Sequence, residues 1–398
     1  MQTGTEGALE LMMRFAERTG LSSPAPAVSP RRYLWTDAFA VCNFLGLAHE
    51  LRDTRYEDLA LRLVGQVHHV LGRYREGDSR TGWISGLSEA EGEAHPTRGG
   101  LRIGKPLPER GPDEPRDEQL EWERDGQYFH YLTKWMHALD QVARATGQPR
   151  FAGWARELAY AGHRAFVVAP ARGGAKRMYW KLSVDLSRPV VASMGQHDPL
   201  DGLVTCAQLE ATRGGAAPSL RTAIADFAAM IEPEALITAD PLGLGGLLVD
   251  AYRVAQLDEK GAGIEGLAQV LLDAALVGVR HYADQTDLLL PAEARLAFRE
   301  LGLSIGLAAV ERANWRRASS GMREAVDRLS QYAWLRAQID SFWLEPAHRE
   351  TESWLAHQDI NEVMLATSLV PEGFLVIAQQ SWPSAHEAAP PGSGIVDR

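Results

Sequence analysis

Hydrophobic residues recur along most of the chain with the spacing of α-helices. Leu9, Met12, Met13 and Ala16, for example, follow i, i+3, i+4 and i+7 spacing and so share one helical face. The pattern predicts twelve helices, approximately over residues 7–19, 34–51, 56–74, 126–145, 151–167, 198–212, 219–231, 241–257, 264–283, 292–314, 322–344 and 351–368. The chain is therefore predicted to be all-α.

Alternate helices differ in how their apolar residues are distributed. Several are apolar nearly all round, which is typical of helices buried on every side, namely those that begin near residues 34, 198, 241 and 292. Their neighbours in sequence are amphipathic and charged on one face, as expected of outer helices. Short polar breaks between consecutive helices indicate antiparallel pairs. We therefore expect one (α/α)6 toroid of six helical hairpins over residues 1–378, followed by a flexible Ser-, Pro- and Gly-rich tail over 379–398.

Two long insertions interrupt this pattern, over about residues 76–123 and 169–196. They contain Trp83, Trp122 and Trp180, and tryptophans of this kind favour ordered rather than disordered segments. Both insertions precede an inner helix, so both should lie over the same end of the ring. We expect them to be irregular or to contain short β-structure.

Composition excludes several classes of function. A formal net charge of −11 argues against nucleic-acid binding, which needs clustered Lys and Arg. No apolar run reaches the roughly 20 residues that span a bilayer, and no signal peptide is visible. Cys42 and Cys206 lie among apolar helical residues and are predicted to be buried free thiols, as in a reducing compartment. We expect a cytoplasmic protein that binds neither membrane nor nucleic acid.

Polar and aromatic residues gather where the inner helices begin. The six starts are Leu34–Asp37, Arg124–Tyr128, Gln196–Pro199, Ala239–Pro241, Pro291–Glu293 and Ala356–Asp359. A ring of hairpins would bring these starts to one end, where they would line a funnel with carboxylates, histidines and aromatic rings.

The segment Leu34–Phe39 is similar to the Trp-x-Asp-x-x-Phe stretch of unsaturated glucuronyl hydrolases, in which the acid lies at the start of an inner helix. Together with the hairpin pattern, the chain resembles six-hairpin glycosidase-like toroid proteins, a group that also includes N-acylglucosamine 2-epimerase-type enzymes. The resemblance implies the toroid fold and a saccharide substrate.

Glycoside hydrolysis needs a proton donor and a second carboxylate near the anomeric carbon. We take Asp37 and Asp125 as the candidate pair, with His197 and Asp198 assisting. The alternative for each acid is helix capping, because Asp is a favoured N-cap residue, and the motifs Asp198-Pro199 and Asp240-Pro241 both predict such caps.

Substrate binding is assigned to residues at the same helix starts and in the mouth insertions, namely Trp35, Tyr128, His130, Trp180, Arg299 and His357. Aromatic faces stack on sugar C–H surfaces. Arg299 could clamp the carboxylate of a uronic acid, or instead form an ion pair with an inner acid. No pair of residues has metal-ligand spacing, and we predict neither a metal nor a cofactor.

Three functions follow from these residues. The first is a glycoside hydrolase with a carboxylate general acid and base, with sugars that contain uronic acid as one substrate class. The second is a sugar epimerase or isomerase that uses His130, His197 or His357 as a base. The third is a non-catalytic or cyclase-like toroid protein.

Overall fold

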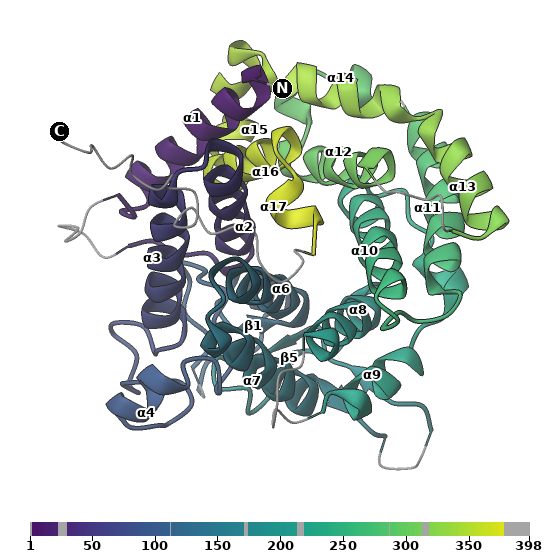
Figure 1. The fold of residues 1–398 in the computed structure, drawn as a ribbon. Helices are drawn as coiled ribbons and strands as arrows, with labels where there is room; N and C mark the ends of the chain where they lie inside the picture. Colours follow the sequence, from purple (N-terminus) through teal and green to yellow (C-terminus); the bar gives the residue numbers. More distant parts are fainter. Residues whose placement is uncertain are drawn as a thin grey trace, which may run out of the picture.

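The computed structural model describes residues 2–22, 30–111, 113–170, 174–212, 219–285, 287–312 and 318–377. The tail predicted over 379–398 lies outside these residues. Within them, six helices form an inner wall in which each contacts the next, and the wall closes where the last helix contacts the first (Figure 1). These inner helices are α2 (Leu34–Leu51), α6 (Phe129–Thr146), α8 (Asp198–Ala211), α10 (Pro241–Glu259), α12 (Ala297–Arg312) and α16 (Gln358–Leu369).

A second layer of helices packs around the inner wall. The outer helices are α1 (Gln2–Arg18), α3 (Thr54–Leu71), α7 (Pro149–Phe166), α9 (Arg221–Ala228), α11 (Leu267–Ala283), α13 (Ser320–Ser330) and α14 (Ala333–Leu344). The molecule is an (α/α)6 toroid, which confirms the predicted fold class.

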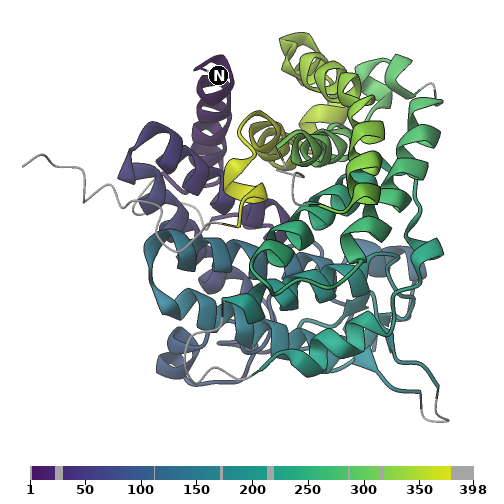
Figure 2. The ribbon, with the colours of Figure 1, turned by 45° about the vertical axis from the view of Figure 1, so that its right-hand side comes forward.

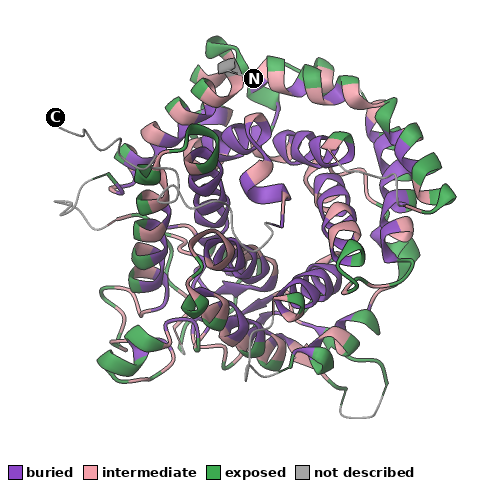
Figure 3. Cartoon of the chain, in the orientation of Figure 1, coloured by how far each residue is buried: buried purple, intermediate pink, exposed green. Residues whose placement is uncertain are grey.

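Burial follows the two layers. The inner helices are buried nearly all round, whereas the outer helices expose one face to solvent (Figure 3). Their apolar side chains form one continuous core that extends around the ring. Cys42 and Cys206 are buried and free, as predicted. Among the described helices, none combines the length and apolar character needed to cross a membrane.

The remaining elements lie in the connections. The first insertion contains α4 (Glu89–Ala94) and α5 (Glu118–Glu123). A small antiparallel sheet of order β1-β4-β5 and the pair β2-β3 lie in the connections that lead into α6 and α8. These connections belong to the mouth, by which we mean the end of the ring where the inner helices begin. Their bounds are β1 (Gln127–Tyr128), β2 (Val167–Val168), β3 (Arg177–Met178), β4 (Lys181–Leu182) and β5 (Pro189–Val191). In the described residues, the first insertion is irregular apart from two short helices and the second contains short strands, as expected.

Two inner helices approach one another unusually closely. A Cβ atom on Gly245 of α10 would lie 2.0 Å from the carbonyl oxygen of Gly302 of α12, and one on Gly306 would lie 2.7 Å from the Cα of Gly245. Only glycine allows this contact, because any side chain would force the two backbones apart. Gly245, Gly302 and Gly306 thus set the spacing between α10 and α12.

A short helix, α17 (Glu372–Leu375), fills the axis of the ring at the end opposite the mouth (Figure 1). The turned view of Figure 2 also shows it inside the wall. Gln141 of α6 donates hydrogen bonds to the carbonyl oxygens of Gly373 and Val376, at 2.9 and 2.7 Å. Gln256 of α10 donates to Leu375 at 3.0 Å. The plug is therefore tied to the inner wall through its backbone.

Several element boundaries differ from the predicted ones. The helix predicted over 322–344 is two helices, α13 and α14, and the one predicted over 351–368 is split into α15 (Glu352–Leu355) and α16. The helix predicted from residue 292 begins as α12 at Ala297, after a 3₁₀ turn at Ala292–Ala294. In each case the apolar periodicity continues through a turn, so the pattern alone does not locate the break.

We expect Gly306→Ala to lower the free energy of unfolding by about 1–3 kcal/mol, because the added methyl group overpacks the contact with Gly245. Urea denaturation measures this change. Gly65→Ala in α3 is the matched control, since its Cβ would meet nothing within 4 Å. That substitution should raise stability by up to about 1 kcal/mol through helix propensity. Equal effects at both positions would contradict the role of the α10–α12 contact.

Candidate active site

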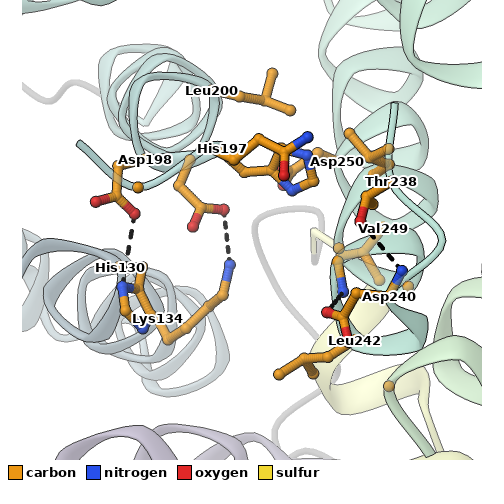
Figure 4. Close-up of a pocket in the computed structure, with 18 of the residues that line it drawn as sticks. His130, Lys134, His197, Asp198, Leu200, Thr238, Asp240, Leu242, Val249 and Asp250 are labelled. Atoms are coloured by element: carbon orange, nitrogen blue, oxygen red, sulfur yellow. Dashed lines mark hydrogen bonds and ion pairs between the residues drawn. The ribbon is translucent and has the colours of Figure 1, made fainter. Parts of the chain in front are cut away.

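The mouth of the ring opens into a cavity of about 390 Å³. Its walls are the N-terminal halves of the inner helices, and its floor is the side chain of Phe374 from α17, which stacks on Phe39 with ring centroids 4.2 Å apart. Figure 4 shows polar side chains from α6, α8 and α10 around this space. Residues far apart in the sequence therefore meet in one pit.

Six of the ten predicted site residues line this cavity, namely Trp35, His130, Trp180, His197, Asp198 and Arg299. The other four, Asp37, Asp125, Tyr128 and His357, are not among its lining residues. The structure therefore brings together the histidine part of the predicted site and separates it from the predicted carboxylate pair.

Asp37 and Asp125 are buried, and each carboxylate is engaged by an arginine and by a backbone N–H. Asp37 lies 3.3 Å from the Arg32 guanidinium and accepts the backbone N–H of Tyr33 at 3.0 Å. Asp125 pairs with Arg102 at 2.5 Å, and it accepts a backbone N–H of the first insertion, from Gly104, at 3.0 Å. Both acids hold the chain at the start of an inner helix. We therefore do not retain them as the catalytic pair.

Tyr128 supports the site from outside the cavity, whereas His357 lies beside it. The Tyr128 ring stacks on the His130 ring, with centroids 5.5 Å apart, and so limits its orientation. His357 is the N-cap residue of α16, and its ring packs edge-on against Phe298. Neither residue reaches the space in which a ligand would lie.

His130 and Asp198 face one another across the cavity wall. Nδ1 of His130 lies 3.5 Å from Oδ1 of Asp198 (Figure 4). At 3.5 Å the two groups are in electrostatic contact, and Nδ1 is the ring nitrogen that faces the carboxylate. Oδ2 of Asp198 is buried and has no hydrogen-bond partner in the described part of the chain. The predicted cap at Asp198 is absent, because α8 begins at Asp198 itself and His197 is its N-cap residue.

His197 is held by a backbone carbonyl group. Its Nε2 lies 3.0 Å from the carbonyl oxygen of Leu236, which belongs to the turn after α9. A carbonyl oxygen can only accept, so Nε2 holds the proton and Nδ1 holds the lone pair of the neutral ring. The cavity thus contains two imidazoles that each face a neighbouring acceptor, and a hydrogen bond sets the tautomer of His197.

Lys134 and Asp201 form an ion pair between these histidines, with Nζ and Oδ1 2.8 Å apart. Burial opposes ionisation of Asp201, yet the Lys134 ammonium holds its pKa below the ordinary value. His130 and His197 lower that pKa further, so both imidazoles act on the same carboxylate. The group is a compact charge network rather than a set of independent side chains.

Two further acids of the cavity are paired. Asp240 accepts the backbone N–H of Gly243 at 2.9 Å, which confirms the predicted N-cap of α10, and its other oxygen lies 2.6 Å from Arg299. Burial raises the pKa of Asp250, although Arg253 at 3.0 Å partly offsets this effect. No group of three or more His, Cys, Asp or Glu side chains that could hold a metal occurs within the described ranges.

Aromatic side chains supply the apolar surface of the cavity. Trp35 packs on Phe39 at 4.4 Å, and Trp180 reaches the cavity from the second insertion. Trp122 of the first insertion meets Trp180 edge-on at 4.9 Å. Contact between the two insertions thus holds Trp180 at the mouth.

Sequence reasoning missed Lys134, Asp250 and Phe374 as cavity residues. Lys134 could have been found, because it lies four residues after His130 and so shares its helical face. Asp250 is in the middle of an apolar helix, where a single acid gives no local sign of what it faces. Phe374 comes from a short helix that the periodicity does not reveal.

No protein-family model matches the chain, and no curated protein matches it at a significant level. Among solved structures, the chain is similar to cellobiose 2-epimerase from Bacillus thermoamylovorans, with TM-score 0.45, 11% identity, and coverage of 84% of this chain and 88% of that one. It is also similar to cellobiose 2-epimerase from Spirochaeta thermophila, with TM-score 0.46, 11% identity, and coverage of 92% and 98%. A third similar structure is an unsaturated glucuronyl hydrolase with dGlcA-Glc-Rha-Glc, with TM-score 0.39, 14% identity, and coverage of 92% and 95%. At this level of similarity, none of these proteins indicates the reaction.

The burial of Asp37 predicts a pH effect on stability. Burial raises the pKa of Asp37 to about 6, although Arg32 opposes the shift. The folded state therefore holds this proton more tightly than the unfolded chain, and stability is lost as the pH rises from about 4 to about 6. Relative to Asp37→Asn, the wild type should lose about 3 kcal/mol over this range in urea denaturation.

Asp53→Asn is the matched control for this measurement. Hydrogen bonds from Arg55 hold the pKa of Asp53, the partly exposed N-cap of α3, below its ordinary value. The stabilisation by the Asp53 carboxylate is present above the unfolded pKa and is lost as the pH falls. The stability of the wild type relative to Asp53→Asn should therefore rise with pH, whereas its stability relative to Asp37→Asn falls. A pH-independent difference between wild type and Asp37→Asn would show that the Asp37 carboxyl titrates normally.

Proposed function

We propose that this protein is a carbohydrate-active enzyme that moves a proton on the carbon next to the carbonyl of an open-chain sugar, as an epimerase or isomerase does. The observation that supports this most is the presence of two histidines, His130 and His197, in one cavity, one beside the Asp198 carboxylate and the other hydrogen-bonded to a backbone carbonyl. Proton transfer beside a carbonyl needs a base and a conjugate acid within reach of the same carbon.

The chemistry balances without an added reagent. One imidazole takes the proton from C2 of the open-chain aldose, and the C–H electron pair forms a C1=C2 double bond while the carbonyl electrons move to O1. An imidazolium then returns a proton. Return to the opposite face of C2, while the O1 electrons re-form the carbonyl, gives the epimer. Return to C1, with transfer of the O2 proton to O1 and formation of the C2=O2 carbonyl, gives the ketose. The developing charge on O1 would be stabilised by a cation, and the Lys134 ammonium lies between the two histidines.

Asp198 is the group that we assign to positioning His130. A carboxylate beside Nδ1 stabilises the imidazolium that forms when Nε2 takes a proton. The arrangement leaves Nε2 of His130 for the substrate.

The same cavity provides surfaces for a sugar ring. Trp35 and Trp180 offer aromatic faces to the apolar side of a pyranose, and Arg299 and Asp240 offer donors and acceptors to hydroxyl groups. Because Arg299 is already paired with Asp240, a neutral sugar fits this site better than a uronic acid.

Glycoside hydrolysis is the second candidate, and one observation favours it. Oδ2 of Asp198 is buried without a partner in the described residues, as a proton donor awaiting a glycosidic oxygen would be. Hydrolysis also needs a second carboxylate, however, and the other cavity acids that we describe, Asp201, Asp240 and Asp250, are each in an ion pair.

NMR of reducing sugars in D2O distinguishes these functions. The panel contains glucose, mannose, N-acetylglucosamine, glucuronate, cellobiose and lactose, each incubated with the full chain. We expect deuterium at C2 of at least one sugar, together with its epimer or ketose, and no cleavage of a glycosidic bond. Cleavage without exchange would support the hydrolase instead. If neither exchange nor cleavage occurs, both enzymatic functions are contradicted and a non-catalytic toroid is favoured.

His130→Asn and His197→Asn should each lower the exchange rate by about 100-fold or more, because general acid–base catalysis contributes about 10²–10⁴-fold. The rate is measured by loss of the C2 proton signal. His69→Asn on the exposed face of α3 and Asp37→Asn, which lies outside the cavity, are the controls and should retain the wild-type rate. Loss of activity in Asp37→Asn with the fold intact would return that acid to the mechanism.

A further inference from the structure

A second cavity, of about 450 Å³, lies beside the first at the mouth. It is formed where α11 ends and where α10 and α12 begin. Asp240 and Arg299 line both cavities, and their side chains are 2.6 Å apart. Both side chains are partly exposed, at 33% and 41%, so the ion pair faces open space on the boundary between the two cavities.

The charged groups of the second cavity are held in place by one another. Arg295 pairs with Glu300 at 2.6 Å, and the Trp343 indole donates to Glu300 at 2.8 Å. The Arg295 guanidinium also lies 3.6 Å from the centroid of the Phe342 ring. Most of the charge is thus neutralised within the wall, which favours a neutral polar ligand over an ion.

One polar atom of this wall is unused. The Tyr282 hydroxyl has no hydrogen-bond partner among the described residues, and the side chain is 2% exposed. A buried hydroxyl without a partner costs free energy, and a ligand hydroxyl can remove that cost. Burial raises the pKa of Tyr282, so the group keeps its proton and can both donate and accept.

We propose that the second cavity is a binding site for a further sugar ring, so that the substrate contains at least two linked rings. The reacting ring occupies the first cavity, the glycosidic linkage crosses the Asp240–Arg299 pair, and the second ring lies against Tyr282. This inference rests on the proposed function, because it assigns a second ring to the same substrate.

Isothermal titration calorimetry of the full chain with glucose, cellobiose, maltose and lactose tests the proposal. At least one disaccharide should bind about tenfold more tightly than glucose. Ala294→Trp fills the second cavity from an exposed position and should abolish that difference while the affinity for glucose stays unchanged. Tyr282→Phe removes only the hydroxyl and should weaken the disaccharide alone, by about threefold or more.

Glu293→Trp is the matched control, because it places the same side chain one residue earlier, on an exposed residue that does not line the cavity. It should bind every sugar as the wild type does. Equal affinity of wild type and Ala294→Trp for all disaccharides would overturn this inference but leave the proposed function intact. If the wild type bound none of the four sugars and exchanged no sugar proton, the proposed function would fail and this inference with it.

Discussion

The structure depends on how the hollow axis of the helical ring is filled. Six apolar helices that pack side by side leave a channel along their common axis, and an empty apolar channel would forfeit the contacts that stabilise a core. At one end, α17 occupies this space, and Phe374 contacts Phe39 while Gln141 holds the backbone of the plug. At the other end, the channel stays open and becomes the cavity. The site is thus the part of the axis that the chain does not fill.

The open end is also the end at which the inner helices begin, and this has an electrostatic consequence. Helix N-termini present partial positive charge and unpaired N–H groups, so acids are stabilised there. Asp198, Asp201 and Asp240 all lie in or next to a first turn that faces the cavity. Lys134 and Arg299 from neighbouring helices balance the charge of Asp201 and Asp240, and His130 faces Asp198. Each charged side chain therefore holds another in position.

The sequence predicts the layers well because burial on all sides and burial on one side leave different periodic patterns. It also predicts the cap at Asp240, because that signal is local to Asp240-Pro241. It does not predict which acids face the axis. Asp37 and Asp125 lie at inner-helix starts as expected, yet Arg32 and Arg102 in the adjoining loops pair with them. An acid at a helix start has the same local sequence whether it faces a loop or a cavity, so only the tertiary structure separates the two cases.

The position of α17 in the chain has a consequence for biosynthesis. Translation delivers all six inner helices before the residues of α17, and α1 contacts α16, which also emerges late. On the ribosome the growing ring therefore has neither its closing contact nor its floor until that final stretch is made. A product that stops before residue 372 would lack Phe374 beneath the cavity and would expose an apolar channel at both ends. Such a shortened product would be a target for chaperones and proteases rather than a partly active enzyme.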